Sequence, residues 1–470
     1  MPSADAVHRE PFVHLVDLAH DRALIAWGAF FFVHDDRHDR WEILDDSELA
    51  DRVGRTTCIG HEAESFGPAE VEVVDHAGDV VSSARTSGTW AWLGGLEPET
   101  EYRYRVLVDG RPWAEGALHD WLPDPRGGYD LRASERAYDL RFTTWPAPEA
   151  PTPDLTFLAI GDYGVGIRSD SESSRRQRRV AEVLDLLVVE QSARFVLSLG
   201  DNIYQGELGA VDDESGGEDD DWYSSFFQPY RHALARVPFF PAIGNHDSTD
   251  SEGSDDRAQM EDNFHIAARF DGYGRSCTSP GLFYRMRFGR DLELVSIDTS
   301  LDSEEPGVRR HFQGAAGRWL DGVFSEPDVR WRIPFSHHPM YCAGPSHSDD
   351  EDLCQVMEPL LERAQVRLVL AGHEHNFQMG RVDGRTHVVS GAGGQVREHH
   401  PDRIGQRGVD AWAGQAHLLT VEVTQDQLRL TPYAGVGPGR TLEPMTVLDA
   451  HNRVHRPPFV VPGTSSAWAP

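Results

Sequence analysis

The sequence predicts an N-terminal all-β sandwich followed by an α/β domain. Residues 10–145 contain segments in which apolar and polar side chains alternate with period two, as in half-buried strands. Residues 146–153 read PAPEAPTP, a proline-rich linker that marks a domain boundary. From residue 154 to about residue 440, short apolar runs alternate with helical patterns, which is typical of layered α/β domains. Residues 441–470 are expected to form a C-terminal tail.

The clearest strand of the first domain is YRYRVLV at residues 102–108, which ends at the turn pair Asp109-Gly110. The preceding segment, GLEPETEY at residues 95–102, resembles the tyrosine-bearing corner of fibronectin type III domains. The first domain is therefore expected to be fibronectin type III-like and to carry no catalytic residues. Further strands are expected at residues 23–32, 71–74 and 139–143.

The second domain begins with an apolar strand and then an amphipathic helix, expected at residues 173–191. An acidic, glycine-containing insertion follows at residues 207–221. A solvated loop is the favoured interpretation of this insertion, and a calcium site is the alternative.

The composition fits a globular protein. Hydrophobic residues make up 39% of the 470 residues, which is enough for a packed core. No apolar run reaches the roughly 20 residues of a membrane helix. The first residues lack the basic and then apolar pattern of a secretory signal. A cytoplasmic location is the default expectation, and secretion is the alternative if a signal preceded this sequence.

The net charge of −33 arises from 44 basic and 77 acidic residues. Such acidity disfavours a nucleic-acid polymer or an anionic membrane as a partner. It also repels phosphate compounds unless positive charge, such as a metal pair, lies in the site. The sequence identifies no protein partner and no oligomeric state.

The four cysteines are too few for a disulfide scaffold, and none belongs to a CxxC pair. Cys342 and Cys354 lie twelve residues apart and could form one disulfide. Reduced, buried cysteines are the favoured interpretation.

The feature that indicates chemistry is a strand ending that occurs five times. Each time an apolar run is followed by a side chain that can bind a metal, in most cases directly after a glycine. The carboxyl ends of strands in open α/β sheets meet at one edge, where ligands bind. One such ending is weak evidence, but five in order predict one site. The five segments are FLAIGD (157–162), FVLSLGD (195–201), FFPAIGNHD (239–247), IPFSH (333–337) and LVLAGHEH (368–375).

These segments resemble the calcineurin-like metallophosphoesterases, from about residue 155 to about residue 422. The resemblance implies a four-layer αββα sandwich for the second domain. The motifs that carry it are GDYG (161–164), GDNIY (200–204), GNHD (244–247), HHP (337–339) and GHEH (372–375).

One departure from the common pattern indicates the branch. Most of that superfamily has Asp-x-His at the first motif, whereas this chain has Gly164 in the third position. Tyr204, three residues after Asp201, would replace the missing histidine ligand. This exchange, together with a β-sandwich before the catalytic domain, is similar to the purple acid phosphatase branch.

The resemblance implies two metal ions that share Asp201 as a bridging ligand. A phenolate suits Fe(III) at metal one, and mixed oxygen and nitrogen donors suit Fe(II), Zn or Mn at metal two. The implied ligands are Asp162, Asp201, Tyr204 and His375 for metal one, and Asp201, Asn245, His337 and His373 for metal two.

The implied activity is that of an acid phosphatase-like phosphomonoesterase, in which a metal-bridged hydroxide hydrolyses a phosphate ester. His246 would stabilise the phosphoryl group or protonate the leaving alcohol, with Asp247 orienting it. His347, ten residues after His337, lies where plant enzymes of this type carry an acid histidine. Because His338 directly follows His337, either histidine could be the ligand of this motif. The His-x-Pro pattern favours His337.

A small-molecule phosphate ester is the expected substrate, and two alternatives stay open. A phosphodiesterase or nucleotide hydrolase would use the same metal pair. A binding module whose catalytic domain has decayed is disfavoured, because all seven ligand positions are filled. The physiological substrate depends on loops that the sequence does not place.

Overall fold

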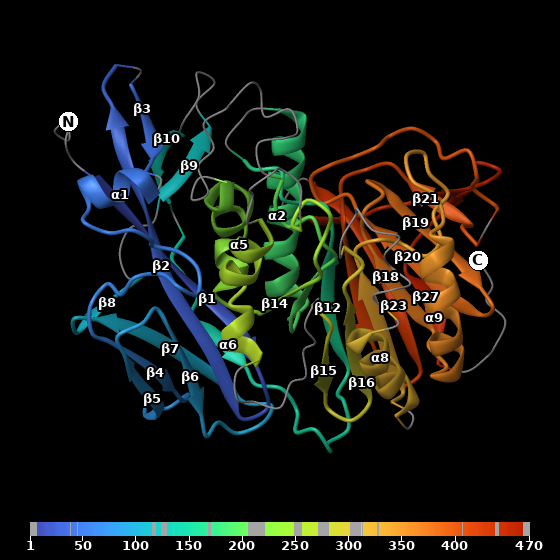
Figure 1. Cartoon of the computed structure of the whole chain (residues 1–470), viewed down its shortest axis with the longest axis horizontal. Helices are drawn as coiled ribbons and strands as arrows, with labels where there is room; N and C mark the ends of the chain where they lie inside the picture. Colours follow the sequence, from blue (N-terminus) through green and yellow to red (C-terminus); the bar gives the residue numbers. More distant parts are fainter. Residues whose placement is uncertain are drawn as a thin grey trace.

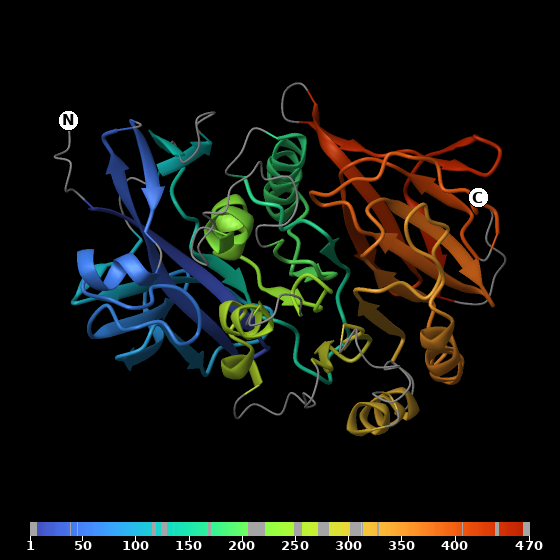
Figure 2. The ribbon, with the colours of Figure 1, turned by 45° about the horizontal axis from the view of Figure 1, so that its top comes forward.

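The computed structural model places the N-terminal β domain beside a larger α/β domain (Figures 1 and 2). The acidic insertion at residues 207–221 lies outside the described residues except for Asp221. The structure describes residues 7–37, 39–44, 46–114, 119–123, 129–134, 136–167, 171–204, 221–248, 256–270, 282–300, 312, 314–326, 329–406, 408–437 and 441–463.

The N-terminal domain consists of two antiparallel sheets, with one short helix α1 (Asp46–Arg52). Buried residues of both sheets belong to one hydrophobic cluster, and strands make up most of the regular structure of this domain, as the all-β prediction expects. The first sheet contains β1 (Val7–Leu18), β2 (Arg22–Asp35), β3 (Arg40–Ile43), β6 (Trp90–Gly94), β9 (His119–Pro123) and β10 (Tyr129–Ala133). The second contains β4 (Ala69–Val74), β5 (Val80–Thr86), β7 (Glu101–Val108), β8 (Arg111–Pro112) and β11 (Arg141–Thr143).

The predicted tyrosine corner is present at the start of β7. The backbone N–H of Glu97 donates a hydrogen bond of 3.0 Å to the hydroxyl of Tyr102. A hydrogen bond between such a tyrosine hydroxyl and the backbone a few residues upstream is a feature of immunoglobulin-like sandwiches. The closer likeness to fibronectin type III domains stays a prediction.

The second domain is built on two mixed sheets that lie side by side (Figure 1). Strands β12, β13 and β14 are parallel neighbours in the first sheet. Strands β16, β17 and β18 are parallel neighbours in the second sheet. The first sheet contains β12 (Leu155–Ile160), β13 (Val196–Ser198), β14 (Phe239–Pro241), β22 (Leu418–Val423), β23 (Gln427–Gly437), β24 (Thr441–Pro444) and β27 (Phe459–Pro462). The second contains β15 (Tyr284–Phe288), β16 (Leu292–Ile297), β17 (Trp331–Ser336), β18 (Leu368–Ala371), β19 (Phe377–Val382), β20 (Arg385–Ser390), β21 (Ala411–Ala413), β25 (Val447–Asp449) and β26 (Val454–His455).

Helices cover the outer face of each sheet. The predicted helix appears as α2 (Glu172–Glu190) and packs its buried valines and leucines against β22 and β23. Helices α8 (Ala315–Ser325) and α9 (Glu351–Arg363) share a hydrophobic cluster with β16 of the second sheet. This order of helix, sheet, sheet and helix is the expected αββα arrangement. The remaining helices are η1 (a π-helix, Tyr223–Phe227), α4 (Gln228–Leu234), α5 (Asp256–Asn263) and α6 (Ile266–Phe270).

The C-terminal segment is part of the α/β domain and not a separate tail. Strands β24 and β27 pair with β23, and β25 pairs with β21. Residues 441–462 therefore complete both sheets. Their short, irregularly spaced apolar runs gave no sequence signal for these partners, which lie elsewhere in the chain.

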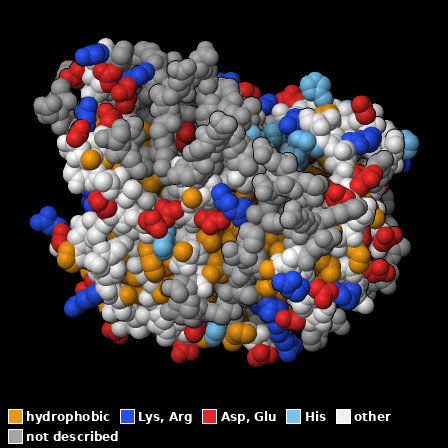
Figure 3. All heavy atoms as spheres, in the orientation of Figure 1, with side chains coloured by type: hydrophobic (Ala, Val, Ile, Leu, Met, Phe, Trp, Pro, Cys, Tyr) orange, Lys and Arg blue, Asp and Glu red, His pale blue; other side chains and the backbone are white. Residues whose placement is uncertain are grey.

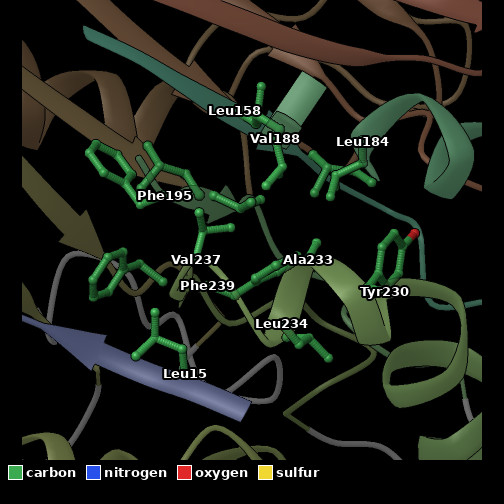
Figure 4. Packing of buried hydrophobic residues seen from close by; sticks show 14 of the residues in the cluster. Leu15, Leu158, Leu184, Val188, Phe195, Tyr230, Ala233, Leu234, Val237 and Phe239 are labelled. Atoms are coloured by element: carbon green, nitrogen blue, oxygen red, sulfur yellow. The ribbon is translucent and has the colours of Figure 1, made fainter. Parts of the chain in front are cut away.

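The two domains share one hydrophobic core. The ring of Phe12 on β1 lies 4.4 Å from that of Phe227, and the Tyr104 hydroxyl donates to the Ala235 carbonyl at 2.7 Å. Figure 4 shows Leu15 of β1 in one packed group with Phe239 of β14. The linker is also held, since Thr152 N donates to Asp291 at 2.9 Å. The N-terminal domain is therefore docked on the α/β domain.

On the face seen in Figure 3, acidic and basic side chains are interspersed. In the described part of the chain, no helix is both long and apolar enough to cross a lipid bilayer.

Candidate metal centre

The predicted strand endings meet at the carboxyl edges of the two sheets. Three of the residues that follow these strands have left-handed backbone conformations, with φ of 56° at Asp162, 50° at Asp201 and 71° at His373. Positive φ is uncommon outside glycine and concentrates at functional sites. The parallel pairing of the strands brings these turns together.

The four predicted metal-one ligands gather around the Tyr204 hydroxyl. The Tyr204 hydroxyl lies 3.0 Å from Asp201 Oδ2, 3.4 Å from Asp162 Oδ1 and 3.4 Å from His375 Nε2. His375 Nε2 is 3.3 Å from Asp162 Oδ1. One oxygen or nitrogen atom from each of the four side chains therefore faces the same point.

The predicted metal-two ligands form an adjoining group around His337. Its Nε2 lies 3.3 Å from Asp201 Oδ1, 3.1 Å from Asn245 Oδ1 and 3.2 Å from His373 Nδ1. Asp201 thus presents Oδ2 to the first group and Oδ1 to the second, as expected for a bridging carboxylate.

The ring orientation of His337 is fixed by the backbone. Its Nδ1 lies 2.8 Å from the Leu199 carbonyl, which can only accept, so Nδ1 carries the proton. Metal-binding histidines usually have their second nitrogen held in this way. Burial alone would lower the pKa of His337, but Asp201 outweighs that effect and raises it to about 9, so Nε2 also carries a proton until a cation replaces it.

This donor set fits cations. Asp162 and Asp201 are at most 1% exposed, and Tyr204 is 4% exposed. Burial, and then the charges of Asp201 and Asp162, raise the pKa of the Tyr204 phenol well above its usual value. The phenolate can therefore form here only if a cation takes the place of its proton. Carboxylate, phenolate, amide and imidazole donors suit iron, zinc or manganese.

Electrostatics also links the two groups. Burial alone would raise the pKa of Asp201, but His337 outweighs that effect and lowers it. Burial and then the Asp201 charge raise the pKa of Asp247 to about 7. Burial and the neighbouring His337 lower the pKa of His373, which favours the neutral imidazole that a metal requires.

The two predicted catalytic histidines both border the ligand groups. The ring of His246 lies 4.5 Å from that of Tyr204, and its backbone N–H donates to Asp201 at 3.0 Å. The ring of His347 stacks on His373 at 3.8 Å. His338, the alternative register, also lies close, with its ring 4.3 Å from that of His373 and Nδ1 3.0 Å from Thr299 Oγ1.

Two buried acids support the site in ways that the sequence did not reveal. The Asp247 carboxylate accepts hydrogen bonds from the backbone of Gly244, Asn202 and Ile203 and from the Asn202 side chain, all at 2.8–3.2 Å. Asp247 therefore joins the loop after β13 to the loop after β14. These contacts differ from the predicted role of Asp247, which was to orient His246.

The other supporting acid is Glu374, between the ligands His373 and His375. Its Oε2 accepts from the backbone of Ser346 at 3.1 Å and of His347 at 2.8 Å, and Oε1 accepts from Arg397 at 3.2 Å. The GHEH motif was the available signal for this role, because side chains in an extended segment alternate and Glu374 is therefore directed away from the ligands on either side of it. Cys342 and Cys354 are free thiols, as favoured from the sequence.

The structure also explains the missing histidine at the first motif. A Cβ atom on Gly164 would lie 2.0 Å from the carbonyl oxygen of Asn202 and 2.5 Å from Cα of Ile203. No side chain fits there unless the backbone moves. The close approach instead positions Tyr204, whose N–H donates to the Gly164 carbonyl at 2.8 Å.

Comparison with known proteins agrees with this geometry. The family of calcineurin-like phosphoesterases matches residues 155–377, which include all seven predicted metal ligands. Among curated proteins, tartrate-resistant acid phosphatase type 5 of Oryctolagus cuniculus is 28% identical over 268 residues, covering 53% of this chain and 75% of that protein.

Two solved structures share the fold over nearly the whole chain. PhoD has a TM-score of 0.61 at 13% identity, covering 97% of this chain and 92% of its own. The purple acid phosphatase PPD1 from yellow lupin (Lupinus luteus) seeds has a TM-score of 0.55 at 13% identity, covering 95% of this chain and 73% of its own. At such identity these likenesses show the fold alone.

Proposed function

Because this chain is a calcineurin-like phosphoesterase of the purple acid phosphatase-like branch, we propose that it hydrolyses phosphate monoesters at a dinuclear metal centre. The observation that carries this proposal is the contact of Tyr204 with Asp162, Asp201 and His375 at 3.0–3.4 Å. Gly164 leaves no room for the histidine that would make a different centre.

The seven ligands divide as their contacts suggest. Asp162, Tyr204 and His375 hold the first metal, and Asp201 is shared by both. When bound, the metal pair would activate water and neutralise charge on the phosphate during in-line attack. The second metal is held by Asn245, His337 and His373.

The chain's own side chains then act on the substrate. His246 is partly exposed, with its ring 4.5 Å from that of Tyr204, and its imidazole can donate a proton to the leaving oxygen or a hydrogen bond to the phosphoryl group. His347 is a second candidate acid, and Glu374 holds its backbone and lies 3.3 Å from its Nδ1. A small phosphate ester is the proposed substrate.

The proposed metals are Fe(III) at the first site and Fe(II), Zn or Mn at the second. Tyr204 supports this assignment, because a phenolate is a hard anionic donor. We also propose that residues 10–145 form a fibronectin type III-like domain, supported by the tyrosine corner, and that it supplies no catalytic residue.

The test is the Tyr204→Phe variant. An Fe(III)-phenolate gives a visible charge-transfer band, so wild-type protein should be coloured and the variant colourless with lower turnover. The matched control is Tyr433→Phe, a partly buried tyrosine whose hydroxyl accepts from Gln191 far from the ligands. A colourless, iron-free protein that is fully active with zinc or manganese would contradict the metal assignment. Absence of phosphoester hydrolysis with any metal would contradict the function.

A further inference from the structure

A second group of metal-binding side chains lies in the N-terminal domain. His8 and Glu10 are two residues apart on β1, so their side chains leave the strand on the same side. His119 is the first residue of β9. Its Nδ1 lies 3.1 Å from Glu10 Oε2, and His8 Nε2 lies 3.3 Å from the same oxygen. The three donor atoms all lie within 4.8 Å of one another.

These separations suit a tetrahedral metal ion. With bonds of about 2.0–2.1 Å, neighbouring donors around zinc are about 3.3–3.4 Å apart. The catalytic ligands have the same spacing, since His337 Nε2 to Asp201 Oδ1 and His375 Nε2 to Asp162 Oδ1 are both 3.3 Å. The N-terminal group is therefore arranged like the catalytic one.

Simple ion pairing explains the arrangement less well. A hydrogen bond between an ionised histidine and a carboxylate is usually about 2.7–2.9 Å long, shorter than both distances here. Both imidazoles also face one oxygen, although the carboxylate has two. The two rings are perpendicular, with centroids 4.4 Å apart, as separate ligands of one ion can be.

The other oxygen of Glu10 has different partners. Oε1 accepts from the backbone N–H of His119 at 3.1 Å and lies 3.7 Å from Arg231 Nη1. Glu10 is 4% exposed, so its charge needs compensation. Arg231 satisfies Oε1 but leaves Oε2 directed at the two imidazoles.

We propose that His8, Glu10 and His119 bind one zinc ion, separate from the catalytic pair, with a fourth position open to water. Two imidazoles and one carboxylate are a common zinc donor set. Arg231 on α4 donates to the carbonyl of His119 at 2.6 Å and to Asp120 at 2.5 Å, so zinc would fix β1 and β9 against the catalytic domain.

The test counts metal in the full-length chain. Wild-type protein is stripped with a chelator, reloaded with excess zinc and desalted, and zinc is measured by mass spectrometry. His8→Asn and His119→Asn should each retain one equivalent fewer than wild type, with unchanged hydrolysis. The matched control is His20→Asn, a histidine of the same domain 3.7 Å from Asp21, which should keep the wild-type count. Equal zinc in all four proteins would overturn the proposal.

A second measurement needs no substitution, in case the variants do not fold. Diethyl pyrocarbonate labels accessible imidazoles, and peptide mass spectrometry maps the labelled positions. In wild-type protein zinc should protect His8 and His119 from labelling but leave His20 unchanged. Labelling of His8 and His119 at the same rate with and without zinc would refute the site, whatever happens at the catalytic centre.

Discussion

Replacing Gly164 by alanine should disable the metal centre without touching any ligand. The added Cβ would lie 2.0 Å from the Asn202 carbonyl oxygen, whereas ordinary contact begins near 3.4 Å. The Asn202–Ile203 backbone must therefore move by roughly 1.4 Å, the difference between these distances. Tyr204 is the next residue, and its hydroxyl is 3.0–3.4 Å from three other ligands. A misplacement of about 1 Å can reduce turnover by about 10²-fold.

The assay measures the iron charge-transfer band, bound metal and turnover of Gly164→Ala. We expect a weakened or shifted band and about 10²-fold lower turnover in a folded protein. The control is Gly322→Ala on α8, where no atom lies within 4 Å of the added Cβ and the helix should gain about 0.5–1 kcal/mol. If Gly164→Ala keeps wild-type colour and turnover, the close approach does not position Tyr204 and the reasoning is refuted.

Three further predictions concern the site, the domain interface and acid stability. Asn245→Ala should lose the second metal, whereas His246→Ala should keep both metals. The turnover of His246→Ala should fall by about 10²–10⁴-fold, and by less for esters with acidic leaving groups. Metal analysis beside kinetics distinguishes the two variants, and one metal equivalent missing from His246→Ala would show that His246 is a ligand. Because the two domains share one core, Phe12→Ala should lower the free energy of unfolding by about 3–5 kcal/mol in urea titrations. For the same reason, a chain starting at residue 151 should not fold alone. A soluble, active truncation would contradict this. Burial, and then nearby positive charge, lower the pKa of His14, which stays neutral when folded but takes up a proton below about pH 6.5 when unfolded. Burial of His14 should therefore lower the free energy of unfolding by up to about 1.4 kcal/mol per pH unit as the pH falls below 6.5. In thermal melts, the stability of His14→Leu should decline less steeply with acid than that of wild type or His20→Asn. Identical slopes would refute this prediction.

The place of the candidate site could be predicted from the sequence because its signal is local. A buried strand, a glycine and a polar residue occupy adjacent positions, and β-sheet geometry alone brings such ends together. The role expected for Tyr204 came from the family resemblance, in which a glycine at position 164 is paired with a tyrosine three residues after Asp201. The strands and tyrosine corner of the first domain were predictable for the same reason, because period-two alternation is written within one segment.

The features that escaped prediction depend on distant contacts. Asp247 and Glu374 look like ordinary loop residues until the fold directs them at backbone N–H groups from other loops. The role of the strands within residues 441–462 could not be predicted without their partners, β21 and β23. A proline-rich linker suggested separable domains, but Phe12 of β1 and Phe30 of β2 pack on Phe227 of η1 across the boundary.

The central claim is that one bridged pair of metal ions hydrolyses phosphate monoesters, and Asp201 tests it most directly. Its two oxygens face the two ligand groups, Tyr204 at 3.0 Å and His337 at 3.3 Å. Bound metal and hydrolysis of aryl phosphate mono- and diesters should be measured for wild type and Asp201→Ala. The account predicts two metals at the catalytic centre of the wild-type chain, in addition to the zinc proposed for the N-terminal domain, with faster hydrolysis of the monoester. The variant should lose these two metals and the hydrolysis. A folded Asp201→Ala protein that still hydrolyses the ester at the wild-type rate would contradict it.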